Sequence, residues 1–283
     1  MRLIGTSTQR TYRYVRIAIV GAVVLLLVSL AAVVVSDGPV SSISAMYYTP
    51  ARGVFTGALF AIALALIALS GHSVEQALLD IAALFAPLIA IVPTPILAGD
   101  VAGYAVTCPA PGPCVPAGEL PAVQNGMLSL AVVGALGVMT ALVLARVQGT
   151  LSAGVAVTLV VAAAIVVAAA AWALLGPASF VALGHLVATG VFFGIVAVVS
   201  TIAAITSAAP WRGIYRVVAI GIAVVLVGLV AVLALRLGGV DLVAVTGIPL
   251  VLLGELAVVV LFAVYWVAQT VQFWDDANPA ILP

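Results

Sequence analysis

Residues 41–70, SSISAMYYTPARGVFTGALFAIALALIALS, place a polar and aromatic segment directly before an apolar run. Gly53 and Gly57 open that run with the G-x-x-x-G spacing, which lets membrane helices approach each other closely. An apolar run that starts at a short polar boundary is typical of a helix entering a membrane. This stretch therefore predicts a membrane-spanning helix with a few specific side chains gathered at its end.

The composition extends this prediction to the whole chain of 283 residues, which is 66% hydrophobic and 6% charged, with a mean hydropathy of +1.41. A water-soluble domain carries about a quarter charged residues. The strands of a membrane β-barrel would alternate apolar and polar residues, and no such alternation is present. With zero net charge and no basic tract, nucleic acid is not an expected partner. We predict an all-α, polytopic transmembrane helical bundle.

Apolar runs divide the chain into about eight spans, because a helix needs about 20 residues to cross a bilayer core. An even number of spans places both termini on the same side. The first run follows a basic N-terminus, but it is long for a signal peptide and many spans follow it, so we expect an uncleaved helix. The predicted spans lie near 17–36, 53–70, 77–92, 126–145, 151–175, 180–207, 217–235 and 242–267.

The arginines give the orientation of these spans. Positive residues concentrate on the cytoplasmic side of membrane proteins. This topology places two arginines, Arg52 and Arg236, on the outer side. The inner side receives Arg2, Arg10, Arg13, Arg16, Arg146, Arg212 and Arg216. We therefore expect a multi-pass protein of the bacterial cytoplasmic (plasma) membrane, with cytoplasmic N- and C-termini.

One long connection, residues 94–124, is predicted on the outer face. It contains the sequence CPAPGPC and further prolines, which prevent a long helix. Cys108 and Cys114 lie on the oxidising side, where disulfides persist. No further Cys or His stands nearby to complete a metal site, so we predict a disulfide.

The second and sixth spans share a short sequence echo. Residues 51–57, ARGVFTG, match residues 188–194, ATGVFFG, at five of seven positions. Both spans run in the same direction in this topology, which suggests a 4+4 parallel internal repeat like those of some transporters. Chance similarity between Ala/Gly/Val/Phe-rich helices is the alternative.

Ionisable residues are costly inside a membrane, so each one is a candidate functional residue. Arg52, His185 and Glu255, with Tyr47 and Tyr48, are predicted to form one ligand-binding pocket in the outer half of the membrane. An arginine fork suits a phosphate or carboxylate headgroup. The alternative is structural, with an Arg52–Glu255 ion pair and His185 bonded to a backbone carbonyl.

No signature of an enzyme is present. The sequence contains no HExxH, HxxxH or GxSxG motif, and its two histidines, His72 and His185, fall at opposite faces. Catalytic zinc needs about three protein ligands, so no metal, cofactor or catalytic residue is predicted. We expect Asp80 to pair with an inner arginine. Pro249 lies in the last span above Glu255, where we expect either a break that exposes backbone carbonyls or an ordinary kink.

Five segments together resemble a known group of membrane proteins. They are SISAMYYTPARGVFTGALFAIAL, LDIAALFAPLIAIVPT, GHLVATGVFFGIVAVVS, WRGIYR and ELAVVVLFAVYWVAQ. The set resembles uncharacterised bacterial multispanning proteins, which are distantly similar to the DRAM/Frag/Sfk group of eukaryotic membrane proteins. That resemblance implies a role connected with lipids, without a shared catalytic signature.

Three functions remain open from the sequence. The first is a non-enzymatic protein that binds or organises membrane lipids, or that serves in envelope assembly. The second is a small-molecule or ion-coupled transporter with Glu255 as the coupling carboxylate. The third is an accessory subunit whose 94–124 loop and C-terminal tail contact a membrane-protein partner.

Overall fold

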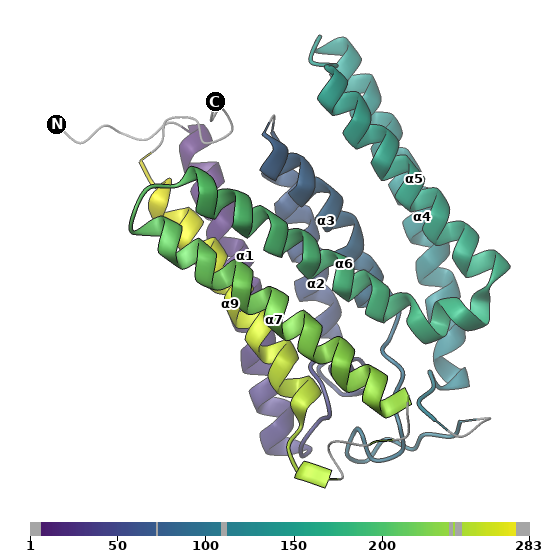
Figure 1. Cartoon of the computed structure of the whole chain (residues 1–283). Coiled ribbons are helices and arrows are strands. Elements are labelled where there is room, and N and C mark those ends of the chain that lie inside the picture. The colour runs from purple at the N-terminus through teal and green to yellow at the C-terminus, as the bar shows by residue number, and fades with distance from the viewer. Residues whose placement is uncertain (1–6, 72, 109–111, 238–239, 241–244, 276–283) are drawn as a thin grey trace.

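A computed structural model of the chain describes residues 7–71, 73–108, 112–237, 240 and 245–275. Arg2, His72, part of the CPAPGPC loop and the end of the C-terminal tail lie outside these residues. Within them, the chain forms eight long helices and two short 3₁₀ turns (Figure 1). The helices are α1 (Ser7–Ser36), α2 (Arg52–Ala68), α3 (Val74–Ile91), α4 (Leu120–Val147), α5 (Ala153–Leu175), α6 (Pro177–Thr206), α7 (Trp211–Leu237) and α9 (Leu250–Gln272).

These helices confirm the prediction of an all-α membrane bundle. Seven of the described helices are long and apolar enough to span a membrane, and α2, with 17 residues, is shorter but equally apolar. The last helix begins at Leu250, directly after Pro249, where a span from residue 242 was predicted. Pro249 therefore starts α9 and does not kink its interior.

Local sequence signals determine several helix ends. Ser73 caps α3 in a capping box with Gln76, and Ser152 caps α5 by accepting a hydrogen bond from the Val155 N–H. Gly149, with φ of 68°, closes the turn between α4 and α5 in the left-handed conformation that glycine adopts without strain.

Six helices pack into a closed ring. Each contacts the next in the order α1, α2, α3, α6, α7 and α9, and α9 returns to α1. Arg13 near the start of α1 donates a hydrogen bond to the Trp274 carbonyl just beyond α9, at 2.7 Å. Both chain ends of the bundle thus meet at one end, which we call the terminal end. The opposite end, which carries the long 92–119 connection, is the loop end.

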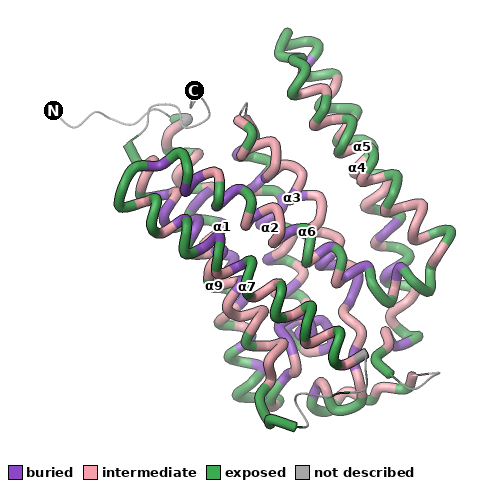
Figure 2. Tube along the Cα trace, viewed as in Figure 1, coloured by how far each residue is buried: buried purple, intermediate pink, exposed green. Residues whose placement is uncertain are grey.

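The remaining helices, α4 and α5, form a hairpin outside the ring (Figure 1). An apolar cluster of Val92, Val123, Met127 and Phe180 anchors the hairpin near the loop end. This arrangement differs from a 4+4 division, because each predicted half contributes one helix to the hairpin. The burial pattern follows the same division, with buried residues concentrated in the ring (Figure 2).

The G-x-x-x-G glycines do not mediate the helix contacts expected of them. Within the described part of the chain, no atom lies within 4 Å of a Cβ placed on Gly53, Gly57, Gly190 or Gly194. Close approaches occur instead at Gly221 and Gly254, where a Cβ would lie 2.8 Å from Leu261 and 2.7 Å from Leu229. These two glycines bring α7 and α9 together.

The long connection lies across the loop end, where hydrogen bonds and an ion pair attach it to the bundle. The Ser41 N–H donates to the Asp100 carbonyl at 3.0 Å, and Asp100 also lies 3.7 Å from Arg236 of α7. The sulfurs of Cys108 and Cys114 lie at disulfide-bonding distance, as predicted, with their Cα atoms 5.8 Å apart. The connection is therefore attached both to the segment before α2 and to α7.

Candidate functional site

Arg52 lies at the start of α2 and is fully engaged by neighbours at the loop end. Its Nη1 lies 2.8 Å from Glu119 Oε2, and its Nη2 donates to the Tyr47 hydroxyl. The guanidinium also stacks on the Tyr47 ring, 3.8 Å from the centroid. Tyr104 donates to the other Glu119 oxygen at 3.2 Å. We call Tyr47, Arg52, Tyr104 and Glu119 the Arg52 cluster.

Tyr48 adjoins this cluster through ring contacts with Tyr47 and Tyr104, at 5.4 and 5.2 Å between centroids. Its hydroxyl donates to the Thr94 carbonyl at 2.8 Å. Burial raises the pKa of the Tyr47, Tyr48 and Tyr104 hydroxyls above the ordinary value of 10.0. These hydroxyls therefore stay neutral, and they act as hydrogen-bonding groups that tie the connection to the bundle.

His185 and Glu255 belong to a second, separate cluster, which is centred on Ser44. The Ser44 Oγ lies 2.8 Å from Glu255 Oε1 and 2.8 Å from His185 Nε2. The Ser44 backbone N–H donates to Glu255 Oε2 at 3.1 Å, and His185 Nδ1 lies 2.7 Å from the Val92 carbonyl oxygen. These contacts join the 3₁₀ turn η1 (Ser44–Tyr48) to α6 and α9. We call these three residues the Ser44 cluster.

The predicted five-residue pocket is thus divided between two clusters. The alternative Arg52–Glu255 ion pair does not form, because Arg52 pairs with Glu119. The other half of that alternative, a bond from His185 to a backbone carbonyl, is present. Glu255 is the sixth residue of α9 and lies near the loop end of that helix.

The Ser44–His185 contact resembles a nucleophile and its base, but the surrounding geometry differs from a catalytic triad. In a triad, a carboxylate orients the histidine through its second nitrogen. Here that nitrogen meets a backbone carbonyl, and the carboxylate contacts the serine instead. Ser44 and His185 are 6% and 1% exposed, so a substrate has no open approach to them.

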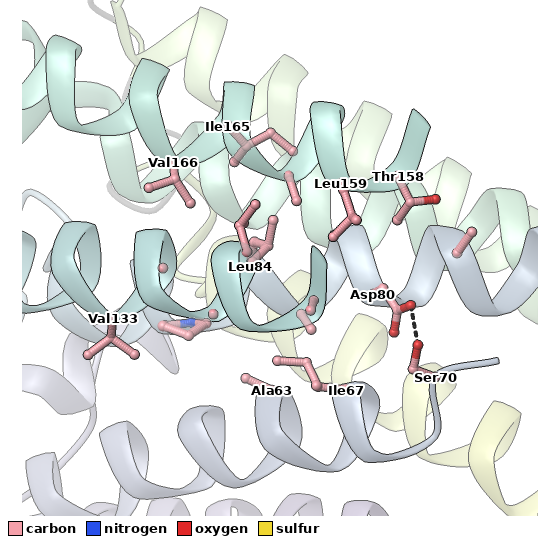
Figure 3. A pocket seen from close by; sticks show the side chains of 18 of the residues that line it. Ala63, Ile67, Ser70, Asp80, Leu84, Val133, Thr158, Leu159, Ile165 and Val166 are labelled. Carbon is pink, nitrogen blue, oxygen red and sulfur yellow. Dashed lines mark hydrogen bonds between the residues drawn. The ribbon is translucent and has the colours of Figure 1, made fainter. Parts of the chain in front are cut away.

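A large cleft separates the ring from the hairpin. It has a volume of about 610 Å³ and lies between α2 and α3 on one side and α4 and α5 on the other. Apolar side chains line most of it, including Leu84, Val133 and Ile165 (Figure 3). We call it the hairpin cleft. It lies within membrane-spanning helices, so lipid is the surrounding solvent.

Polar groups gather where the hairpin cleft meets the terminal end. Asp80 of α3 lies there with Ser70 and Thr158 (Figure 3), and Ser152 at the start of α5 also lines the cleft. Ser70 Oγ donates to Asp80 Oδ2 at 2.6 Å, and no arginine pairs with Asp80 among the described residues. Asp80 Oδ1 is buried and has no hydrogen-bond partner in the described structure. The cleft is therefore amphipathic, with an apolar length and one polar end.

A second apolar cleft of about 490 Å³ lies on the loop-end side of the hairpin. It shares Met127, Ala131 and Ala170 with the hairpin cleft. The hairpin is therefore flanked by two adjacent apolar spaces. The sequence did not single these out, because Ala/Val/Leu-rich helices carry the same residues on lipid-facing and cleft-facing sides.

The described residues contain no group of three or more His, Cys, Asp or Glu side chains placed to hold a metal ion. Comparison with protein families, curated proteins and solved structures found no match to this chain.

Proposed function

We propose that this integral membrane protein binds a membrane lipid in the hairpin cleft. The observation that carries the proposal is the form of the cleft, an apolar space of about 610 Å³ between membrane-spanning helices with polar side chains at one end. A lipid has the complementary form, since its acyl chains are apolar and its headgroup is polar. In a bilayer, the acyl chains of neighbouring lipids are the groups available to fill an apolar cleft between membrane helices.

The polar end of the cleft favours a headgroup with N–H or O–H donors. Asp80 Oδ1 lacks a donor, and buried polar atoms normally have one. A carboxylate in a membrane also favours a positive or donor-rich neighbour. An ethanolamine- or glycerol-type headgroup supplies such donors beside Ser70 and Asp80.

The arginines support binding from the cytoplasmic leaflet of a bacterial plasma membrane. Of the described arginines, Arg52 and Arg236 belong to the loop end. Those at the terminal end are Arg10, Arg13, Arg16, Arg146, Arg212 and Arg216. Under the positive-inside rule, the terminal end and both chain termini face the cytoplasm. Asp80 then lies in the cytoplasmic half of α3, on the side of the inner leaflet.

This site differs from the outer pocket predicted around Arg52. An anionic headgroup there would have to displace Glu119 from the guanidinium, and Glu255 is already bonded to Ser44. The hairpin cleft requires no such displacement. The lipid-related role implied by the DRAM/Frag/Sfk resemblance is in line with this proposal.

Native mass spectrometry of gently extracted protein tests the headgroup site. We expect a retained lipid whose headgroup carries hydrogen-bond donors, and a several-fold lower retention in Asp80→Ala. Asp37→Ala is the matched control, because Asp37 is exposed at the loop end, far from the cleft. Equal lipid retention by Asp80→Ala and the wild-type protein would remove Asp80 from the site.

A further inference from the structure

The contacts of the Ser44 cluster require more hydrogens than its usual ionisation states supply. Three short contacts follow one another, from the Val92 carbonyl to His185 Nδ1, from His185 Nε2 to Ser44 Oγ, and from Ser44 Oγ to Glu255 Oε1. Their lengths are 2.7, 2.8 and 2.8 Å. Polar atoms at these distances are hydrogen-bonded, so each contact needs one hydrogen.

Two of these hydrogens are assigned directly. A backbone carbonyl is an acceptor without a proton, so His185 Nδ1 must carry the hydrogen of the first contact. The Ser44 hydroxyl supplies one hydrogen to one of the two remaining contacts. The Ser44 backbone N–H is already directed at the other carboxyl oxygen, Oε2, and supplies neither.

The third hydrogen must come from His185 or from Glu255. If Ser44 donates to Glu255, then Nε2 carries a proton and the cluster is an imidazolium–carboxylate pair. If Ser44 donates to His185, then Oε1 carries the proton and all three side chains are neutral. A neutral histidine beside an ionised glutamate leaves one contact without a hydrogen.

Neighbouring charged groups do not stabilise the charged alternative. Three charged groups lie at the loop end of helices near the cluster, namely Asp37 after α1, Arg52 on α2 and Arg236 on α7. The two arginines pair with Glu119 and Asp100, and Asp37 accepts a hydrogen bond from Ser36. None of the ion pairs between described residues includes His185 or Glu255. Separated charges in an apolar interior are costly, which favours the neutral arrangement.

We propose that Ser44, His185 and Glu255 form a proton-binding site in which Glu255 Oε1 holds the proton. Glu255 donates to the Ser44 hydroxyl oxygen, and Ser44 donates to Nε2 of a neutral His185. Release of this proton leaves one of the two Ser44 Oγ contacts without a hydrogen and leaves a negative charge among membrane helices. Because the cluster joins η1 to α6 and α9, proton binding is coupled to the packing of these elements at the loop end.

Histidine-selective ¹⁵N NMR and infrared spectroscopy of the full chain in lipid test this assignment. At neutral pH we expect His185 to be neutral, with a proton on Nδ1 and none on Nε2. The sequence contains one other histidine, His72, so His185→Gln assigns the signals. An infrared C=O band of a protonated carboxyl is expected in the wild-type protein and should be lost in Glu255→Gln. Asp37→Asn is the control that should keep it.

Either of two results overturns the proposal. One is an imidazolium signal from His185, and the other is an infrared spectrum whose protonated-carboxyl band does not change in Glu255→Gln. Glu255→Gln is expected to fold, because a carboxamide reproduces the protonated acid. Its NH₂ can donate to Ser44 Oγ, and its carbonyl can accept from the Ser44 N–H. Glu255→Gln should therefore keep the wild-type melting temperature.

Discussion

The six-helix ring and the α4–α5 hairpin have similar compositions but opposite degrees of burial. In α6, ten residues are buried, including the large side chains of Phe180 and Phe192. All residues of α5 are described and none is buried, and α4 has three buried residues. Both regions are strongly apolar, so hydropathy alone does not distinguish a helix held by protein from one held by lipid.

The closely packed helices and the proposed lipid site are therefore different parts of the molecule. In lipid, helices are held together by close packing and hydrogen bonds, not by the hydrophobic effect. The ring has both, with close approaches at Gly221 and Gly254 and the Ser44 cluster joining three elements. The hairpin is anchored mainly near the loop end, and this leaves the cleft beside it.

The largest expected effect compares the same truncation in the two regions. Leu66 of α2 is 1% exposed, whereas Leu144 of α4 is 49% exposed. Leu66→Ala should lower the free energy of unfolding by about 2–4 kcal/mol, because it leaves a cavity in packed protein. Leu144→Ala truncates a half-exposed side chain, so it leaves no enclosed cavity and should cost less than about 0.5 kcal/mol. Reversible unfolding in mixed micelles measures both free energies. Equal losses in the two variants would show that the ring and the hairpin do not differ in packing.

An intermediate effect is expected from enlarging glycines. Gly254→Ala places a Cβ 2.7 Å from Leu229 inside the ring, and such overpacking costs about 1–3 kcal/mol. Gly126→Ala places a Cβ 2.4 Å from Ile91, between hairpin and ring. The added Cβ of Gly126→Ala approaches its neighbour more closely than that of Gly254→Ala. Because the hairpin is packed on fewer sides than a ring helix, it can move to relieve the contact. Gly126→Ala should therefore destabilise the protein less than Gly254→Ala.

Gly228→Ala is the control for this pair, because no described atom lies within 4 Å of a Cβ at that position. Alanine favours helix over glycine, so the control should be neutral or slightly more stable. A greater loss in Gly126→Ala than in Gly254→Ala would show that the hairpin is held as firmly as the ring.

The smallest effect concerns the Arg52–Glu119 pair. The two side chains are 38% and 15% exposed, and solvent screening keeps such pairs weak. A double-mutant cycle with Arg52→Gln and Glu119→Gln should give a coupling of about 0.5–1 kcal/mol that decreases with salt. Zero coupling would mean that the connection is held instead by its contacts at Asp100 and Thr94.

The sequence predicted the helices well because long apolar runs leave few other structures in a membrane. The described helices overlap all eight predicted runs, from 17–36 in α1 to the later part of 242–267 in α9. His185 and Glu255 were singled out for their cost in a membrane, and both occur in one polar cluster.

The sequence did not predict which residues contact Arg52, His185 and Glu255. Glu119 meets Arg52 through a proline-rich connection whose path no periodicity encodes. Ser44 is one of several serines before α2, and its role arises because η1 places it between α6 and α9. The hairpin could not be placed outside the ring, since an alanine-rich helix is compatible with both lipid and protein neighbours.

One matched pair of variants in α5 tests the proposed binding of a lipid in the hairpin cleft. Ala162 of α5 lines the cleft, whereas Ala164 is exposed outside it. Lipid retention should be measured by native mass spectrometry for Ala162→Trp and Ala164→Trp. We predict that the first variant loses the retained lipid because the indole fills the cleft, and that the second keeps it. Equal retention in both variants would contradict lipid binding in the cleft.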